Sequence, residues 1–210
     1  MIKSFLIFGD SIAYGSDDIK GGWAARLRAW VEDLISDDSD SYFRLFNLAV
    51  GGNNTKDLLK RFDFETSQRL DEEVPVTIIF AIGINDSQIF YGQNKILKEE
   101  FESNIEELAE KAQKISKEII FIGLTPVDEK KTVPVAWHKD KSYKNKDIKV
   151  YNEIIKKICK EKKLYFIDVF SQLEKLDYLK SLADGLHPGF EGHEMIFEAV
   201  REYLKGEKIV

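Results

Sequence analysis

Residues 5–15 read FLIFGDSIAYG, an apolar run that ends in glycine, aspartate and serine. The run has the length and the continuous apolar character of a strand that is buried on both faces of a sheet. Turns are commonly built from the residue types that follow it, so this tripeptide alone does not distinguish an ordinary turn from a catalytic serine. A nucleophilic Ser11 needs a base, a group that orients the base and donors for an oxyanion, and the rest of the chain must supply them.

Short apolar runs recur along the chain and alternate with segments of helical periodicity. The predicted strands are 4–8, 43–50, 76–82, 118–124 and 164–169, and the predicted helices are about 22–35, a segment from Thr55, 95–116, 144–161 and 190–205. Such alternation is typical of βαβ units with right-handed crossovers and a parallel sheet. We therefore predict an α/β fold, a three-layer α/β/α sandwich with a five-stranded parallel sheet in flavodoxin-like order.

The length of the chain and its lack of linkers bear on domain organisation. The 210 residues suit one well-buried domain, and no Gly-, Pro- or Ser-rich linker or internal repeat divides them. We predict a single domain over residues 1–210. The longest irregular stretch, 125–142, contains two of the four prolines, and a loop of that length in a compact α/β domain is often functional.

Composition excludes several classes of function. The net charge of −6 argues against a nucleic-acid partner, because phosphate binding needs clustered Lys and Arg, and the lysines of 139–149 are interrupted by aspartates. No apolar run approaches the roughly 18 residues of a membrane span, and the N-terminal run is too short for a signal peptide. We expect a cytoplasmic protein with no membrane partner. The single cysteine, Cys159, excludes an intramolecular disulfide and a multi-cysteine metal site.

Polar residues follow the predicted strands, where open parallel sheets bind their ligands. These segments are Gly9-Asp10-Ser11, Gly51-Gly52-Asn53-Asn54, Gly83-Ile84-Asn85-Asp86, Thr125-Pro126 and, near the C-terminus, Asp184-Gly185-Leu186-His187-Pro188. Taken singly, each is most simply a turn, with Thr55 as the candidate cap of the helix that follows the second segment. Taken together, they supply one coherent chemistry.

The joint chemistry is that of nucleophilic catalysis by a serine. The backbone N–H groups of Ser11 and Gly52 and the side-chain amide of Asn85 are three neutral donors, as an oxyanion hole requires. Among the three histidines, His187 is the one with a carboxylate, Asp184, three residues before it. Asp184 can accept from one ring nitrogen while the other nitrogen takes the proton of the serine.

The other histidines have simpler interpretations. His138 lies in the long irregular stretch, where a solvated or substrate-facing side chain is expected, and His193 on the last helix is expected to be structural or exposed. No H-E-x-x-H spacing or similar metal pair occurs, so a zinc hydrolase is unsupported and we expect neither a metal nor an organic cofactor.

With these residues assembled, the chain resembles the SGNH hydrolases, also called the GDSL esterase/lipase family. The blocks read GDSIAYG, NLAVGGNNT, GIND and DGLHP, in the order of the family, and they run from residue 9 to 188. The resemblance places Ser11 as the nucleophile, Gly52 and Asn85 as oxyanion donors, and Asp184 and His187 as the rest of the catalytic triad. Ile12 stands where the family usually has leucine after the serine.

The resemblance implies a serine esterase or acylhydrolase that acts on a small-molecule carboxylic ester through an acyl-enzyme on Ser11. Two alternatives stay open at this point: a flavodoxin-like module that binds a small ligand, and a hydrolase-like fold that is catalytically silent. The acyl and alcohol parts of the substrate and the oligomeric state are not predicted by the sequence. Aromatic and apolar residues that favour a short-acyl or aryl ester are Tyr14, Ile89, Phe90, Tyr91 and Trp137.

Overall fold

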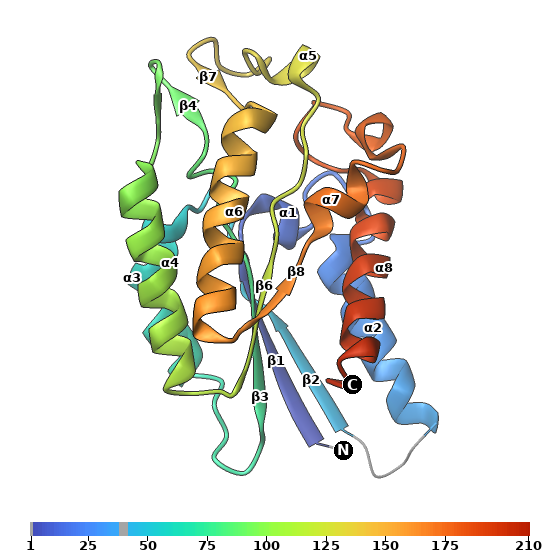
Figure 1. The fold of residues 1–210 in the computed structure, drawn as a ribbon. Coiled ribbons are helices and arrows are strands. Elements are labelled where there is room, and N and C mark those ends of the chain that lie inside the picture. Colours follow the sequence, from blue (N-terminus) through green and yellow to red (C-terminus); the bar gives the residue numbers. More distant parts are fainter. Residues whose placement is uncertain (1, 38–41) are drawn as a thin grey trace.

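A computed structural model describes residues 2–37 and 42–210, and a parallel sheet forms its centre (Figure 1). The strands are β1 (Ile2–Gly9), β2 (Tyr42–Asn47), β3 (Val76–Ala81), β6 (Glu118–Ile122) and β8 (Tyr165–Ile167). They pair in the order β2-β1-β3-β6-β8, with every pairing parallel. This is the flavodoxin-like order, so the fold predicted from the sequence is confirmed.

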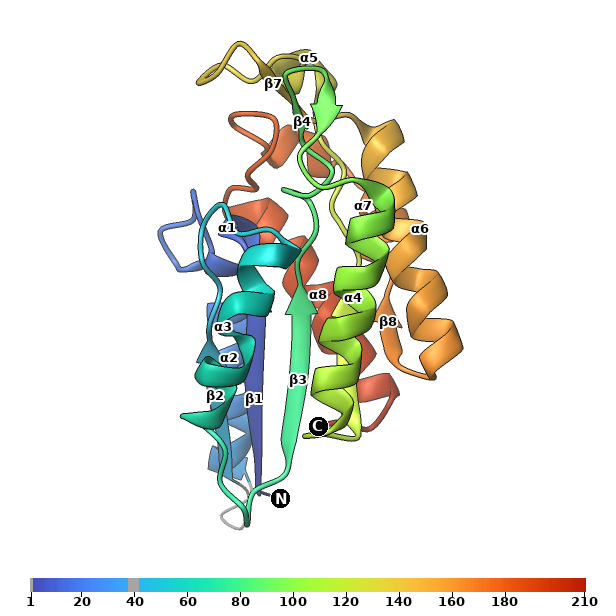
Figure 2. The same cartoon turned by 90° about the vertical axis from the view of Figure 1, so that its left-hand side faces the viewer.

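Helices cover both faces of the sheet. Figures 1 and 2 show α2 (Gly22–Asp37) and α8 (Phe190–Gly206) on one face and α3 (Thr55–Ser67), α4 (Lys98–Gln113) and α6 (Asn145–Lys162) on the other. Four of them were predicted within three residues at both ends, and α3 was predicted at its start, Thr55. Among the described residues, no helix combines the length and the apolar character needed to cross a membrane.

The core explains why the strand sequences are continuously apolar. Phe8 of β1 stacks on Phe80 of β3 with ring centroids 5.9 Å apart, and Phe80 stacks on Phe121 of β6 at 4.7 Å. Phe62 of α3 packs on Phe8 at 5.0 Å, so the aromatic row joins the sheet to a helix layer. Because β1 lies between β2 and β3 and residues 5–8 are fully buried, the end of β1 is a rigid support for whatever follows it.

Small elements that the sequence did not predict lie above the carboxyl ends of the strands. A second sheet joins β4 (Ile89–Phe90), β5 (Gln93–Asn94) and β7 (Lys141–Ser142), and short helices are α1 (Ser11–Tyr14), α5 (Glu129–Thr132), α7 (Val169–Leu173) and the 3₁₀ helix η1 (Tyr178–Ser181). The stretch 125–142 was expected to be irregular, but it contains α5 and the whole of β7. Elements of two to five residues are too short to show a period in the sequence.

The cap of α3 differs from the expectation. Asn54, not Thr55, is the N-cap residue: its side chain accepts from the Asp57 N–H, and the Asp57 side chain accepts from the Asn54 N–H in return. Thr55 is the first residue of the helix, and its hydroxyl donates to Asp86 instead. The prediction of Thr55 as the cap was wrong because a second partner, 31 residues away, takes this side chain.

Candidate active site

Ser11 lies at the carboxyl end of the central strand, as the first residue of α1. Asp10 caps this short helix, because its Oδ1 accepts from the Ile12 N–H at 3.0 Å. Gly9 is required by close packing: a Cβ on this residue would lie 2.4 Å from the Cβ of Ala13 and 2.7 Å from the carbonyl oxygen of Ala81. The turn from β1 into α1 is thus packed tightly between α1 and β3, and it leaves Ser11 partly exposed.

The structure brings Ser11, His187 and Asp184 together, although the first two are 176 residues apart in sequence. Ser11 Oγ lies 2.9 Å from His187 Nε2, and His187 Nδ1 lies 2.6 Å from Asp184 Oδ2. The imidazole therefore has a hydrogen-bond partner at each nitrogen. With the proton on Nδ1 donated to the carboxylate, Nε2 is left as the acceptor for the serine hydroxyl.

Asp184 is oriented by its own backbone as well as by the ring. Its Oδ1 accepts from the N–H groups of Leu186 at 2.8 Å and His187 at 2.7 Å. Burial opposes ionisation of Asp184, but the hydrogen bonds from the His187 ring and these backbone donors outweigh it and hold the pKa of the carboxyl below its usual range. Asp184 is an anion beside the imidazole at neutral pH.

The loop that carries His187 is held by the α5 region. Gly185 has φ +89°, and a Cβ there would lie 2.6 Å from the Cβ of Lys131, so glycine is needed for both reasons. The Asp128 N–H donates to the carbonyl of Gly185 at 2.9 Å, and Lys131 Nζ donates to the carbonyl of Leu182 at 2.8 Å. The stretch 125–142 therefore supports the candidate base from outside the sheet.

Two backbone N–H groups near Ser11 are available to a ligand. Neither the N–H of Ser11 nor that of Gly52 has a partner within residues 2–37 and 42–210. Gly52 has φ +78° in the turn after β2, where an added Cβ would meet nothing within 4 Å, so the glycine serves the backbone conformation. The neighbouring Gly51 places its Cβ position 3.9 Å from the Cβ of Ser11, which brings this turn beside the serine.

The turn after β2 is held in place by a half-buried arginine. Arg61 of α3 donates to the carbonyl of Leu48 at 2.7 Å, to Asn53 Oδ1 at 2.9 Å and to the carbonyl of Gly9 at 3.5 Å. It therefore joins the segments that follow β1 and β2. Sequence reasoning missed Arg61, since an arginine on an amphipathic helix has no signature that separates it from a solvated one.

Asn85 is held at both ends of its amide. Nδ2 donates to the carbonyl of Asn53 at 2.9 Å, and Oδ1 accepts from the hydroxyl of Tyr143 at 2.9 Å. Gln88 Nε2 donates to the same hydroxyl at 2.6 Å. Sequence reasoning missed Tyr143 and Gln88, because neither belongs to a recognisable motif.

Two carboxyl groups are buried beside the site. Asp86 accepts from the Thr55 N–H at 3.1 Å and from the Thr55 hydroxyl at 2.5 Å, which fixes the loop after β3 to the start of α3. Burial raises the pKa of Asp86 to about 7, and it raises the pKa of Asp10 to about 7 as well, against the hydrogen bonds that favour their ionised forms. Both groups position their neighbours through hydrogen bonds.

The remaining histidines lie apart from this arrangement. His193 is fully buried, accepts from the Trp23 N–H at 3.3 Å and lies 3.2 Å from the carbonyl of Ser16. Burial lowers the pKa of His193, so it is a neutral packing residue, in keeping with the structural role expected of it. His138 accepts from the Asp140 N–H in a turn and packs against Phe90.

One group of possible metal ligands occurs among the described residues. Asp17, Asp184 and His187 bring ligand atoms within 4.8 Å of one another. Two of the three already bond to each other, and Asp17 is an exposed residue of the turn after α1. The donor set is thus explained by the histidine–aspartate pair without an ion.

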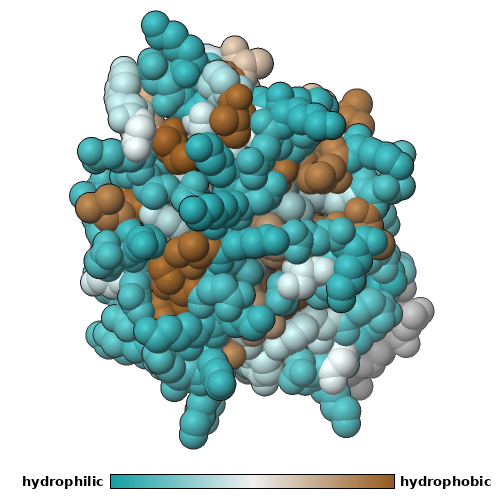
Figure 3. Space-filling view, turned by 45° about the horizontal axis from the view of Figure 1, so that its top comes forward, coloured by the Kyte–Doolittle hydropathy of each residue, from teal (hydrophilic) through white to brown (hydrophobic). Residues whose placement is uncertain are grey.

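Exposed aromatic residues lie beside His187, on α1 and between β4 and β5. The Trp137 ring lies 6.1 Å from the His187 ring, and Tyr14 and Tyr91 are more than half exposed. Figure 3 shows that the upper face is largely hydrophilic, with separate hydrophobic patches. An apolar hollow of about 510 Å³ lies elsewhere, between α7 and α8 around Leu176 and Met195, and none of the site residues lines it. The candidate active site is therefore identified by its hydrogen bonds and not by the size of a cavity.

Comparisons with known proteins identify the family of the chain. The model of the GDSL-like Lipase/Acylhydrolase family matches residues 7–195. The chain is 26% identical over 215 residues to the GDSL esterase/lipase WDL1 of Oryza sativa subsp. japonica, covering 96% of this chain and 77% of that protein. This chain therefore belongs to the GDSL-like lipase/acylhydrolase family, and its activity is ester hydrolysis in the general sense of that family.

Solved structures share the fold. A lipase/acylhydrolase from Enterococcus faecalis superposes with a TM-score of 0.78 at 21% identity, over 98% of this chain and 97% of that one. Axe2, an acetylxylan esterase from Geobacillus stearothermophilus, superposes with a TM-score of 0.70 at 21% identity, over 97% and 93% of the two chains. At this level of identity, the similarity shows a common architecture.

Proposed function

We propose that the chain is a serine esterase that hydrolyses small carboxylic esters through an acyl-enzyme on Ser11. The observation that carries the proposal is the continuous hydrogen-bonded series from Ser11 Oγ to His187 at 2.9 Å and from His187 to Asp184 at 2.6 Å. Membership of an esterase family supports it. The same series makes a catalytically silent fold or a flavodoxin-like module the weaker alternative, because neither needs an oriented imidazole.

Acylation begins when Ser11 Oγ attacks the ester carbonyl and His187 Nε2 takes its proton. The negative charge moves to the carbonyl oxygen, where the N–H groups of Ser11 and Gly52 and the amide of Asn85 are the donors of the oxyanion hole. Asp184 holds the imidazole in the required tautomer and stabilises the imidazolium. His187 then protonates the leaving alcohol, and the bond between the carbonyl carbon and that oxygen breaks.

Deacylation repeats these steps with water. His187 Nε2 removes a proton from a water molecule, whose oxygen attacks the acyl carbon. The bond between this carbon and Ser11 Oγ then breaks, His187 returns the proton to Ser11 Oγ, and a carboxylic acid is released. No metal or organic cofactor is needed for either half. The open site beside Trp137 and Tyr14 suits a short acyl group or an aryl ester.

Replacement of Ser11 by alanine tests the nucleophile. We expect Ser11→Ala to lose at least about 10³-fold in kcat on p-nitrophenyl acetate, because no other group can form the acyl-enzyme. Ser16→Ala is the matched control, since Ser16 lies in the turn directly after α1 and its hydroxyl has no hydrogen-bond partner in the described chain. A fluorophosphonate probe should label Ser11 in the wild type and in the control. Full activity of Ser11→Ala, or labelling at another residue, would contradict the proposal.

A further inference from the structure

We propose that Tyr143 is a positioning residue for the oxyanion hole, which sets the orientation of the Asn85 amide through its hydroxyl. The inference rests on the proposed function, since it assigns a task to a residue behind the candidate oxyanion donor. Tyr143 follows the stretch 125–142 and lies 58 residues from Asn85 in sequence.

The amide of Asn85 has one orientation that satisfies both of its contacts. The carbonyl oxygen of Asn53, 2.9 Å away, accepts and never donates, so the group that faces it must be the NH₂ of Asn85. The Oδ1 of Asn85 then faces Tyr143 at 2.9 Å. A flipped amide would set two acceptor oxygens against each other at the Asn53 side, which the geometry forbids.

The direction of the hydrogen bond from Tyr143 follows from its second contact. Gln88 Nε2 lies 2.6 Å from the Tyr143 oxygen and is a donor there, so the single hydroxyl proton is free to point to Asn85. Burial, followed by the charge of Asp10, raises the pKa of Tyr143 well above its usual range, and the hydroxyl stays protonated. The result is a directed series from Gln88 through Tyr143 to Asn85.

Tyr143 itself is fixed on a small scaffold. Its N–H donates to the carbonyl of Thr132 at 3.0 Å, and the Thr132 hydroxyl donates to the carbonyl of Tyr143 at 2.8 Å. The Tyr143 side chain is 2% exposed, so its ring has little freedom to move. The hydroxyl is therefore held at a constant place relative to Asn85.

The consequence for catalysis is a donor that needs no reorganisation. One N–H of Asn85 is used by Asn53, and the other remains for the substrate oxyanion. Without the Tyr143 hydroxyl, the terminal torsion of Asn85 has a broad range of rotation, and the free N–H loses its direction. The hydroxyl also withdraws electron density from the amide oxygen, which makes the N–H group a stronger donor.

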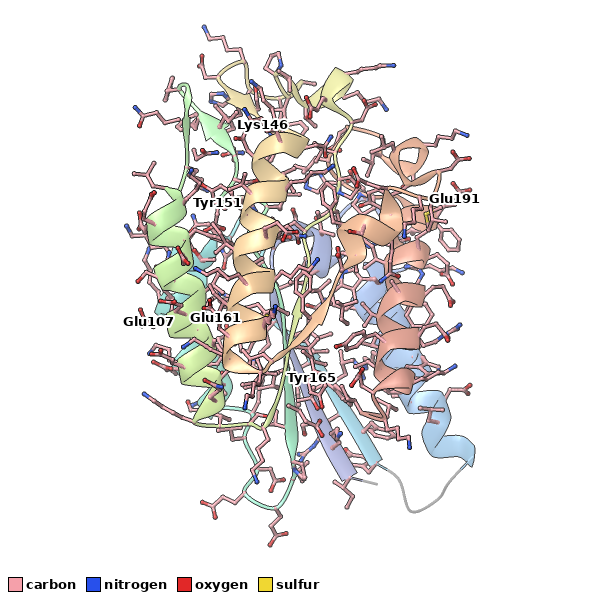
Figure 4. All side chains as sticks on the ribbon, viewed as in Figure 1. Glu107, Lys146, Tyr151, Glu161, Tyr165 and Glu191 are labelled. Atoms are coloured by element: carbon pink, nitrogen blue, oxygen red, sulfur yellow. The ribbon has the colours of Figure 1, made fainter. Side chains whose placement is uncertain are left out.

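Tyr143→Phe tests the proposal, because it removes only the hydroxyl and keeps the ring. We expect kcat on p-nitrophenyl acetate to fall about tenfold with KM nearly unchanged, less than the roughly 10²–10³-fold expected for Asn85→Ala. The affinity for a boronic acid that mimics the tetrahedral intermediate should fall by a similar factor. Tyr151→Phe is the matched control: Tyr151, on α6 (Figure 4), is also buried, and its hydroxyl donates to the carbonyl of Ile96 and not to Asn85.

A double-mutant cycle separates positioning from a general effect on folding. In an Asn85→Ala background, Tyr143→Phe should have no further effect on kcat, because the group that it orients is absent. Gln88→Met provides a second variant, with an expected loss of about threefold that is not additive with Tyr143→Phe. An unchanged kcat in Tyr143→Phe, or equal losses with and without Asn85, would overturn the proposal. Inactive wild-type protein, or unlabelled Ser11, would instead contradict the proposed function.

Discussion

The segments that follow β1, β2 and β3 and the small elements above them hold their residues in different ways. The first group, which we call the floor, consists of residues 9–15, 47–55 and 83–88. The second, which we call the cap, consists of 89–94 and 128–143, with two-residue strands and α5. Floor residues are fixed to buried parallel strands, whereas cap residues are fixed by a few hydrogen bonds between loops.

The two groups support different halves of the candidate chemistry. Ser11 belongs to the floor, where Gly9 leaves no space between β1, α1 and β3. The loop of His187 is held by the cap, through Asp128 and Lys131. The position of the candidate nucleophile is thus set by the parallel sheet, and the position of the candidate base is set by hydrogen bonds to the cap.

The largest loss of activity is expected from Asp184, which orients the His187 ring beside Ser11 of the floor. Asp184→Asn should lower kcat on the order of 10³–10⁴-fold, because an amide in place of the carboxylate favours the wrong tautomer of His187. Steady-state kinetics with p-nitrophenyl acetate measures this loss. Asp177→Asn is the control, since Asp177 is an exposed acid at the start of η1 whose only close partner in the described chain is Lys180. Retention of a tenth of the wild-type kcat by Asp184→Asn would show that the histidine does not depend on this carboxylate.

A smaller effect, on stability, is expected within the floor. The folded-state pKa of Asp86 is about 7 against 3.8 for the ordinary group, chiefly through burial, so the folded protein binds this proton more tightly than the unfolded chain does. The contribution is fully present below the lower value and is lost as the pH rises through the higher one. As the pH rises between these two values, the free energy of unfolding of the wild type should fall relative to that of Asp86→Asn. The fall should exceed about 1.4 kcal/mol, the equivalent of one unit of pKa.

Urea unfolding at several pH values measures the difference for Asp86. The exposed Asp63, which pairs with Lys111 on the surface, provides the control variant Asp63→Asn. Parallel profiles for the wild type and Asp86→Asn would mean that Asp86 is not held in the floor as described.

The smallest effect is expected in the cap. Trp137→Ala removes an exposed ring 6.1 Å from the ring of His187 and should lower kcat/KM for an aryl ester about two- to tenfold, mainly through KM. Hydrolysis of ethyl acetate should hardly change, since this substrate has no aromatic group for the ring to contact. Lys139→Ala in the same turn is the control. An equal loss on both substrates would assign Trp137 to the machinery of the reaction instead of to substrate contact.

The floor was easier to predict from the sequence than the cap, and the reason is physical. Floor residues directly follow long apolar strands, and the carboxyl ends of parallel strands must share one edge, so Ser11 and Asn85 could be placed near each other without coordinates. The DGLHP block then added Asp184 and His187. The structure brings all four to the same end of the sheet.

The cap had no comparable signal. Strands of two residues show no period in the sequence. An isolated aromatic residue such as Phe90 or Trp137 does not indicate whether it lies in a strand or in a loop. Tyr143 could not be predicted, because its contact with Asn85 arises from the fold and no spacing along the chain relates the two residues. Thr55 shows the reverse case: its residue type is suited to the N-terminus of a helix, but its hydroxyl donates to Asp86 of another segment.

Gly9 has a consequence for reading mutational scans of this protein. Since a Cβ on this residue would collide with Ala13 and with the backbone of Ala81, every substitution should displace the turn that carries Ser11. A scan would then rank Gly9 as intolerant as the serine, although Gly9 has no group that takes part in a reaction. Intolerance at the two positions would have separate origins, and only a probe that reacts with the serine would tell a misplaced nucleophile from an absent one.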